Sequence, residues 1–372
     1  MAESKKVIVL GAGRVGRLVA VTLAEDTRLE VVAMDRDESV ISALPRNVRG
    51  KRADLSPKNV KGLVKGADLV VNAVPGFMGF SVLGEIIGAG CDCCDFSFMP
   101  EDAMRLSKAA ERKGVVAAFD CGIAPGFSNI LVGRMAAESK LDDVQIMVGG
   151  LPMKKTNPFG YKALFSPIDV IEEYVRPARL VRNFKAVSMP ALTELELVDL
   201  PGVGTLEAFN TDGLRSLIDT VKAKNMTERT LRYPGHAEKV GLLREIGYFN
   251  DGIVDVKGVR VRPIDVTAKL LFPMWQLKKG EDDLTVMRVV GEGEGRCETW
   301  DILDYSTKGV SSMARTTGYT AVIAAKMILN GEWGVEGVSP PEYIGREKKL
   351  FDKVVRQMKG YGIQITKKVE RA

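Results

Sequence analysis

The chain has 372 residues, which is more than one hydrophobic core usually serves, so two domains are expected. Hydrophobic residues make up 45% and charged residues 27% of it, the balance of a folded globular protein, which excludes a disordered or fibrous chain. The net charge of +5 is spread along the chain and no apolar run reaches the roughly 18 to 20 residues of a bilayer span, so we expect no nucleic-acid partner, no membrane and a cytoplasmic location.

The N-terminal third of the chain alternates short apolar strands with helices. A strand is predicted over residues 6–10 (KVIVL), and the glycine-rich turn GAGRVG follows it directly. A helix over 17–25 and a second strand over 29–34 come next. The alternation continues with predicted strands at 51–53, 67–73, 91–96 and 115–120 and helices at 57–65, 79–89 and 100–112. This order predicts an α/β fold with a Rossmann-type parallel, doubly wound sheet.

The turn GAGRVG predicts a dinucleotide site. Gly11 permits the tight turn, Gly13 lets the backbone approach a pyrophosphate, and Gly16 lets the helix pack closely on the strand. Arg14 and Val15 lie in the same turn. The phosphates would then lie at the helix N-terminus, where unpaired N–H groups and the helix dipole favour negative charge.

Asp35 predicts which dinucleotide binds. It ends the second strand about 20 residues after Gly16, where a carboxylate accepts hydrogen bonds from the adenosine ribose hydroxyls. That carboxylate would repel a 2′-phosphate. Arg36 could bind such a phosphate, but an arginine beside a carboxylate more often stacks on the adenine. We therefore predict NAD as the cofactor in preference to NADP.

Further cofactor contacts are expected at the carboxyl ends of the other strands, because ligands of doubly wound sheets bind there. The residues at these ends are Asp54, Ala73, Val74, Pro75, Phe96 and Ser97. An ordinary turn role would also explain several of them. Asp120 ends the strand nearest the expected nicotinamide position, so it is a candidate catalytic carboxylate.

The five cysteines do not predict a disulfide framework, because their number is odd and three lie within 91–94. The segment CDCCD contains possible zinc ligands. However, the chain has a single histidine, and the segment is typical of a strand whose side chains alternate between faces. We expect no metal.

The second half has a different pattern. A turn after residue 122 leads into a helix ending at 138, and then strands predominate. They are predicted at 144–149, 193–198, 229–233, 259–268 and 284–291. A small-residue helix over 311–329 is expected to pack on the first domain. The predicted domains are a discontinuous NAD-binding Rossmann domain, 1–123 with 305–372, and an inserted α+β substrate and dimerisation domain of mostly antiparallel sheet, 124–304.

Four motifs carry a resemblance to a known family: GAGRVG at 11–16, CGIAPGFSN at 121–129, EAFNTDG at 207–213 and RTLRYPGHAEK at 229–239. With the closing segment 315–342, they make the chain resemble the saccharopine dehydrogenase family, and within it the lysine 6-dehydrogenases.

This resemblance implies an NAD-dependent dehydrogenase with an amino-acid substrate. It would deaminate the ε-amino group of L-lysine to 2-aminoadipate 6-semialdehyde, which cyclises to piperideine-6-carboxylate, and release ammonia. It also implies a homodimer or larger homo-oligomer. Two alternatives stay open: a reductive condensation of the saccharopine or carboxynorspermidine dehydrogenase type with NAD(P)H, and a non-catalytic NAD-binding regulator.

His236 is the first candidate for a general base. It lies where a strand passes through Pro-Gly into a predicted helix over 236–246, so the helix dipole should lower its pKa and keep the imidazole neutral. A neutral base would take a proton from the substrate ammonium and later activate water. The alternative is a surface histidine that caps the helix.

Substrate-binding candidates surround this histidine in sequence. Arg232 could hold an α-carboxylate through two N–H groups, and Tyr233 follows it on the other face of the strand. Asp212 could bind a substrate ammonium and act in catalysis, with Thr211 beside it, although Asp is common in turns for local reasons. Asn157 is a further candidate for the substrate site.

Overall fold

The computed structural model describes residues 4–163, 167–278 and 280–371. Contacts divide the chain into two compact units, Met1–Arg134 with Ala314–Gly362, and Met135–Met313 with Ile363–Ala372. The boundaries predicted from the sequence differ from these, most of all at the C-terminus. There, the final strand belongs to the second unit, not the first.

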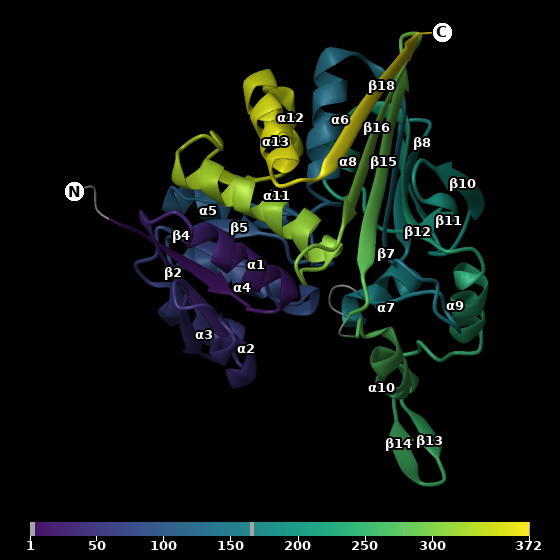
Figure 1. Ribbon diagram of the computed structural model, residues 1–372, viewed down its shortest axis with the longest axis horizontal. Helices are drawn as coiled ribbons and strands as arrows, with labels where there is room; N and C mark the ends of the chain where they lie inside the picture. The colour runs from purple at the N-terminus through teal and green to yellow at the C-terminus, as the bar shows by residue number, and fades with distance from the viewer. Residues whose placement is uncertain (1–3, 164–166, 279, 372) are drawn as a thin grey trace. The chain divides into compact units, whose positions relative to one another are not determined.

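The first unit is a doubly wound parallel sheet, as predicted (Figure 1). Its described strands follow the order β17-β6-β5-β4-β1-β2-β3. They are β1 (Lys5–Leu10), β2 (Leu29–Asp35), β3 (Arg49–Arg52), β4 (Leu69–Asn72), β5 (Asp92–Asp95), β6 (Val116–Ala118) and β17 (Gly337–Ser339). The strand order reverses between β1 and β4, and this is the switch point at which doubly wound sheets bind ligands.

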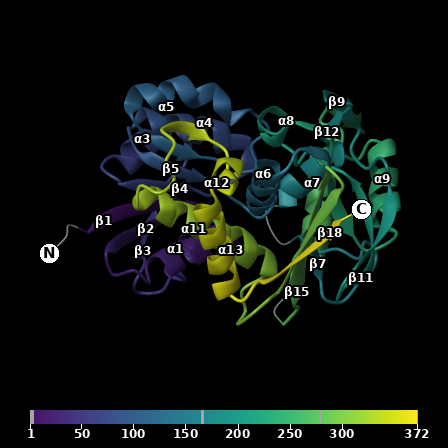
Figure 2. The same cartoon turned by 90° about the horizontal axis from the view of Figure 1, so that it is seen from above.

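Helices cover both faces of this sheet, with α3, α4 and α5 on one side and α1 and α11 on the other (Figure 2). Val7 to Leu10 of β1 are fully buried between them. The helices are α1 (Arg14–Leu23), α2 (Glu38–Ser42), α3 (Pro57–Val64), α4 (Gly76–Gly88), a 3-10 turn η1 (Ala103–Leu106), α5 (Ser107–Lys113), α6 (Phe127–Glu138), α11 (Ser312–Leu329), α12 (Glu342–Arg346) and α13 (Lys348–Gly360). The predicted packing of α11 on this domain is confirmed, because Cys94 Sγ donates to the Ala321 carbonyl (3.5 Å) and Gly318 packs against Leu18.

The second unit is built on a mixed, mostly antiparallel sheet of nine described strands, in the order β10-β11-β12-β7-β15-β16-β18, with β8 paired to β12 and β9 paired to β8. The strands are β7 (Leu141–Pro152), β8 (Ala178–Arg182), β9 (Lys185–Met189), β10 (Glu196–Leu200), β11 (Gly204–Asn210), β12 (Ala223–Arg232), β15 (Asp283–Gly293), β16 (Arg296–Tyr305) and β18 (Gln364–Arg371). Among the described strands of this sheet, β12 and β7 are the one pair that runs in parallel. The predicted fold class is therefore confirmed.

The helices of the second unit are α7 (Pro167–Val175), α8 (Leu217–Thr220), α9 (His236–Glu245) and α10 (Pro263–Trp275), and a separate hairpin pairs β13 (Val254–Val256) with β14 (Val259–Val261). The strand predicted over 259–268 is wrong beyond Val261. Pro263 starts α10 because its fixed φ suits the first helical position. The helix then buries Thr267, Leu271 and Trp275, which are spaced one turn apart.

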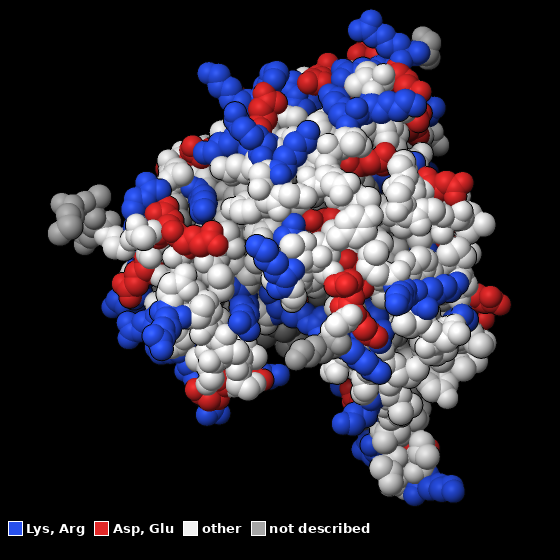
Figure 3. Space-filling view, viewed as in Figure 1, with Lys and Arg blue, Asp and Glu red and all other residues white. Residues whose placement is uncertain are grey.

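Two surface properties complete the description. Acidic and basic side chains are interspersed over the face in Figure 3. None of the described helices combines the length and apolar character needed to cross a membrane.

Candidate functional site

The glycine-rich loop after β1 has the shape of a pyrophosphate cradle. A Cβ on Gly11, whose φ is +98°, would lie 2.6 Å from the Ala73 carbonyl oxygen, and one on Gly16 would lie 2.0 Å from the Gly11 carbonyl oxygen. A Cβ on Gly13 would have no heavy atom within 4 Å, so this side of the loop is open. Gly13 caps α1 without a side-chain hydrogen bond, and Arg14 and Val15 begin the helix with no acidic residue in its first turn. The loop therefore fits a dinucleotide.

Asp35 lies against this loop, at the end of β2. Its Oδ2 accepts from the Ala12 backbone N–H (2.8 Å), and its Oδ1 accepts from the Asp37 backbone N–H (3.0 Å). The carboxylate is thus fixed beside the turn, where the adenosine ribose is expected. The Arg36 carbonyl accepts from Arg52 Nε (3.3 Å). This contact brings a basic side chain to the position beside Asp35, and Arg52 was not among the residues predicted from the sequence.

Asp54 has local partners. Its carboxylate accepts from the backbone and hydroxyl of Ser56 (3.0 and 2.9 Å) and from Asn59 Nδ2 (2.8 Å). These hydrogen bonds, that of the Ser56 backbone first, lower the pKa of Asp54. The carboxylate orders the first turn of α3, so its predicted contact with the cofactor has no support here.

The remaining predicted cofactor residues lie at the carboxyl edge of the sheet. Ala73, Val74 and Pro75 follow β4, and the Ala73 N–H donates to the Leu10 carbonyl (2.9 Å). Phe96 and Ser97 follow β5.

Asp120, which follows β6, lies at the same edge. It is buried and has a φ of +55°. Two buried polar residues of this edge, Asn72 and Asp95, were missed by the sequence analysis because they lie within the predicted strands. No group of three metal-binding side chains occurs among the residues that the structure describes.

His236 begins α9, and its side chain is 1% exposed. Its Nδ1 lies 3.0 Å from the Phe159 carbonyl, which can only accept, so Nδ1 carries the proton. Its Nε2 therefore accepts a hydrogen bond from the Tyr174 hydroxyl, which lies 2.9 Å from it. Burial first, and the charge of Arg232 second, lower the pKa of His236 to about 3. The imidazole is neutral, although burial and not the expected helix dipole is the main cause, and His236 is a core residue and not a surface cap.

Aromatic rings surround this histidine. The edge and tilted contacts among them have centroid separations of 5.3 to 6.5 Å. This aromatic cluster consists of Phe159, Tyr161, Tyr174, Phe209, His236, Phe249 and Trp275. It joins side chains from α7, β11, α9 and α10, which the sequence analysis did not bring together.

Arg232 ends β12 and borders the aromatic cluster. Its guanidinium lies 4.3 Å from the centre of the Tyr161 ring, and its Nη2 donates to Glu173 Oε2 at 2.5 Å. In this ion pair the Arg232 side chain is buried, at 3% exposure, and the Glu173 side chain is mostly buried, at 16%. Burial raises the pKa of Glu173 even though Arg232 opposes the shift. Arg232 Nε and Trp275 Nε1 are buried without a hydrogen-bond partner among the described residues.

The other predicted substrate residues have structural partners. Arg179 binds both carboxylate oxygens of Asp212 (2.8 and 2.9 Å), so the predicted catalytic role of Asp212 is not supported. Thr211 Oγ1 donates to Glu228 Oε2 (2.7 Å), and burial raises the pKa of Glu228 to about 8. The Tyr233 hydroxyl donates to the Pro152 carbonyl (3.0 Å). Asn157 is exposed on a loop.

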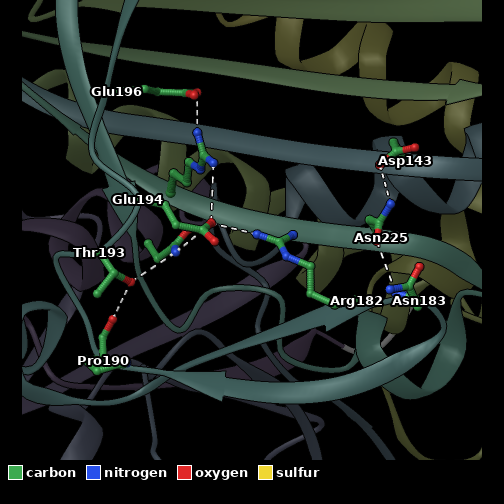
Figure 4. A network of polar contacts seen from close by, with 10 residues as sticks. Asp143, Arg182, Asn183, Pro190, Thr193, Glu194, Glu196 and Asn225 are labelled. Atoms are coloured by element: carbon green, nitrogen blue, oxygen red, sulfur yellow. Dashed lines mark hydrogen bonds and ion pairs between the residues drawn. The ribbon is translucent and has the colours of Figure 1, made fainter.

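A second polar network ties β12 to its neighbours (Figure 4). Glu194 accepts from Arg182 (2.6 Å) and Asn210 (3.1 Å), and Arg229 lies 3.7 Å away. The Asn210 hydrogen bond is the first cause of the lowered pKa of Glu194. Asn225 donates to Asp143 (2.8 Å). These contacts connect β12 with β7, β8 and β11 of the sheet.

Two models of protein families match the chain. Residues 122–363 match the model described as saccharopine dehydrogenase C-terminal domain, and residues 7–118 match the saccharopine dehydrogenase NADP binding domain. The chain belongs to the saccharopine dehydrogenase family. The resemblance carried by the sequence motifs is thereby confirmed at the level of the family.

Three similar proteins share between a fifth and a quarter of their aligned residues with this chain. The mitochondrial alpha-aminoadipic semialdehyde synthase of Bos taurus is 23% identical, over 98% of this chain and 48% of the relative. The NADP+-dependent, L-glutamate-forming saccharopine dehydrogenase of Saccharomyces cerevisiae is 22% identical over 98% and 99%. The carboxynorspermidine synthase of Vibrio cholerae is 23% identical over 92% and 93%. The chain spans about half the length of the first of these.

A solved structure confirms the fold of the family. The apo saccharopine dehydrogenase (L-Glu forming) of Saccharomyces cerevisiae superposes with a TM-score of 0.80 at 20% identity, over 98% of this chain and all of that one.

Proposed function

We propose that the protein is an NAD-dependent dehydrogenase that oxidises the ε-amine of L-lysine. In the first step the ε-carbon loses a hydride and the nitrogen a proton, so that R-CH2-NH3+ and NAD+ become R-CH=NH2+, NADH and H+. Water then adds to the imine, and R-CHO and NH4+ are released. The aldehyde can cyclise with the α-amine of the same molecule.

The observation that carries the substrate assignment is the mostly buried Arg232–Glu173 ion pair. An α-amino acid has a carboxylate and an ammonium on one carbon, and these match a guanidinium and a carboxylate at hydrogen-bond distance from each other. In the described conformation the two side chains neutralise each other. A lysine head group would exchange partners with them, its carboxylate binding Arg232 and its ammonium binding Glu173.

Two unpaired donors support an anion beside this pair. The Nε of Arg232 and the Nε1 of Trp275 are buried N–H groups without acceptors among the described residues, and leaving such a donor unpaired costs about 1 to 3 kcal/mol. Tyr161 contacts both side chains. A substrate carboxylate would supply acceptors here. Because the groups are buried, substrate binding requires the aromatic cluster to open.

His236 is better suited to positioning than to proton transfer. A base with a pKa of about 3 is too weak to deprotonate an alkylammonium of pKa about 10.4. The substrate would therefore react as the neutral amine, which forms when the ε-ammonium loses its proton to solvent at alkaline pH. His236 would fix the Tyr174 hydroxyl, because its Nε2 accepts from that group while its Nδ1 is anchored on Phe159.

The cofactor assignment is supported by the glycine-rich loop and by Asp35. The open side of Gly13 and the first turn of α1 would hold the pyrophosphate, and Asp35 would bind the ribose hydroxyls. NAD supplies the hydride acceptor. The carboxylate disfavours the 2′-phosphate of NADP, although the yeast relative is named for NADP+ and Arg52 lies near Asp35.

A second candidate function is the reductive condensation of an aldehyde with an amino acid. It is favoured by the names of the relatives, which include a saccharopine dehydrogenase and a carboxynorspermidine synthase. Such a reaction consumes NAD(P)H only when both substrates are present, whereas lysine oxidation forms NADH from one.

The test uses the purified full chain with NAD+ at pH 9 to 10 and a panel of amines. L-Lysine should produce NADH. Nε-acetyl-L-lysine, which lacks a free ε-amine, and cadaverine, which lacks the amino-acid head group, should not. Equal rates with cadaverine and lysine would contradict the role of Arg232 and Glu173. NADPH consumption that needs an aldehyde and an amino acid together would favour the second function.

A further inference from the structure

Asp95, the last residue of β5, is a buried carboxyl group that the proposed reaction does not use. It is 0% exposed. Its Oδ1 accepts from the backbone N–H and the hydroxyl of Ser97 (2.8 and 2.7 Å), and its Oδ2 accepts from Asn72 Nδ2 (2.5 Å). Three donors therefore converge on one carboxylate, and they come from the ends of two neighbouring strands.

These contacts join the segments predicted to bind the dinucleotide. Asn72 immediately precedes Ala73, Val74 and Pro75, and Ser97 is itself one of the predicted cofactor residues. Helix α4 is part of the same assembly, because a Cβ on Gly79 would lie 2.1 Å from Ser97 Oγ.

Asn72 shows how this assembly could change. Its Nδ2 donates to Asp95 and, at 3.4 Å, to the Gly79 carbonyl, while its Oδ1 is buried without a partner in the described part of the chain. A proton on Asp95 would reside on Oδ2, since Oδ1 already faces two donors. Two donors would then oppose each other across the Asn72–Asp95 contact. The amide relieves this by turning its unpaired Oδ1 toward Asp95, which removes the hydrogen bond to Gly79.

We propose that Asp95 is a positioning residue for the dinucleotide: its ionised carboxylate holds the segments after β4 and β5 in the binding conformation, and a proton on it releases them. The proposal rests on the cofactor part of the proposed function and not on the amine substrate. It assigns no chemical step to Asp95.

The surroundings of Asp95 place the protonation of its carboxylate near neutral pH. Burial first, with Asp120 adding a smaller repulsion, raises the pKa of Asp95 to about 7. Cys93 of β5 and Cys121 beyond β6 also feel the charge of Asp95, and burial raises the pKa of both thiols so that they stay neutral. Asn72 from β4 and the Gly79 carbonyl from α4 carry no charge.

The test is a fluorescence titration of NADH binding to the full-length protein between pH 6 and pH 9, without an amine. If only the ionised form binds, the apparent Kd should rise about tenfold from pH 8 to pH 6, as the competent fraction falls. Asp95→Asn, which cannot ionise, should bind at least about tenfold more weakly at pH 8 and show no such dependence. Asp92→Asn is the matched control: Asp92 lies at the amino end of the same strand, where it accepts from the Val116 N–H (2.9 Å), so this variant should follow the wild type.

Each result has one meaning. A flat wild-type profile, an unchanged affinity in Asp95→Asn, or a pH dependence that persists in that variant would overturn the role of Asp95. The wild-type profile decides the question alone if Asp95→Asn does not fold. Absence of NADH binding at every pH would instead overturn the proposed cofactor, and absence of lysine oxidation alone would leave this proposal standing.

Discussion

Protonation of His236 is the perturbation whose cost follows most directly from the structure. The chain contains one histidine, and both of its ring nitrogens have partners inside the aromatic cluster. Its pKa is depressed from 6.5 to about 3, so its contribution to stability is complete above pH 6.5 and is lost as the pH falls below that value. At pH 5 the loss is about 2 kcal/mol, since each pH unit below 6.5 corresponds to 1.36 kcal/mol.

Two assays measure this effect. In protein labelled only at histidine, NMR should show one imidazole whose shifts stay constant from pH 8 to pH 5. Urea unfolding at pH 7 and pH 5 should then be compared between wild type and His236→Asn. Other titrating groups cancel in the comparison, so the wild type should lose about 2 kcal/mol more than the variant on acidification.

The reasoning would be refuted by an imidazole that titrates near pH 6.5. Such a titration would mean that the ring is solvated, and that the contacts with Tyr174 and Phe159 do not persist in solution. An equal acid sensitivity of wild type and His236→Asn would lead to the same conclusion.

Three further predictions test the rest of the site. Glu228 has a pKa raised from 4.5 to about 8, so wild-type stability should fall as the pH rises from 5 to 8, by on the order of 4 kcal/mol from this group. Chemical denaturation of Glu228→Gln should show a much smaller fall, and an equal fall would be evidence against a buried carboxyl. Arg232→Lys should lower kcat/KM for L-lysine by on the order of 100-fold, because a buried guanidinium is lost from the pair with Glu173. Steady-state kinetics with the folded variant measure this decrease, and an unchanged kcat/KM would exclude Arg232 from substrate binding. Asp35→Ala should lower the preference for NADH over NADPH at least about tenfold in a binding titration, whereas a preserved preference would place the selectivity elsewhere.

The first unit was largely predictable because its signals are local. The turn GAGRVG, the β1 strand and Asp35 lie within one short stretch, and each glycine meets the backbone constraint expected of it. The second unit was less predictable because its sheet joins distant strands. Residues 259–268 contain β-branched residues that favour a strand, but Pro263 and the packing of Trp275 produce a helix. The sequence prediction placed β18 in the first domain. No sequence motif indicates that this strand pairs with β16 of the second unit.

The candidate site was predictable only where a motif marked it. His236 and Arg232 lie in the segment RTLRYPGHAEK and are close together. Their partners Glu173 and Tyr174 come from α7, which matches no motif, so only tertiary structure reveals them. Asp212 shows the opposite case: its place in a motif suggests chemistry, while tertiary structure supplies Arg179 as a partner for its carboxylate.

The most direct test of the central claim follows the nitrogen that is released. Purified protein is incubated with NAD+ and L-lysine labelled with 15N at either the ε- or the α-position, and both NADH and ammonium are measured. The proposed function predicts equal amounts of NADH and 15N-ammonium from the ε-labelled substrate and unlabelled ammonium from the α-labelled one. Label released from the α-position, or no NADH with either substrate, would contradict it.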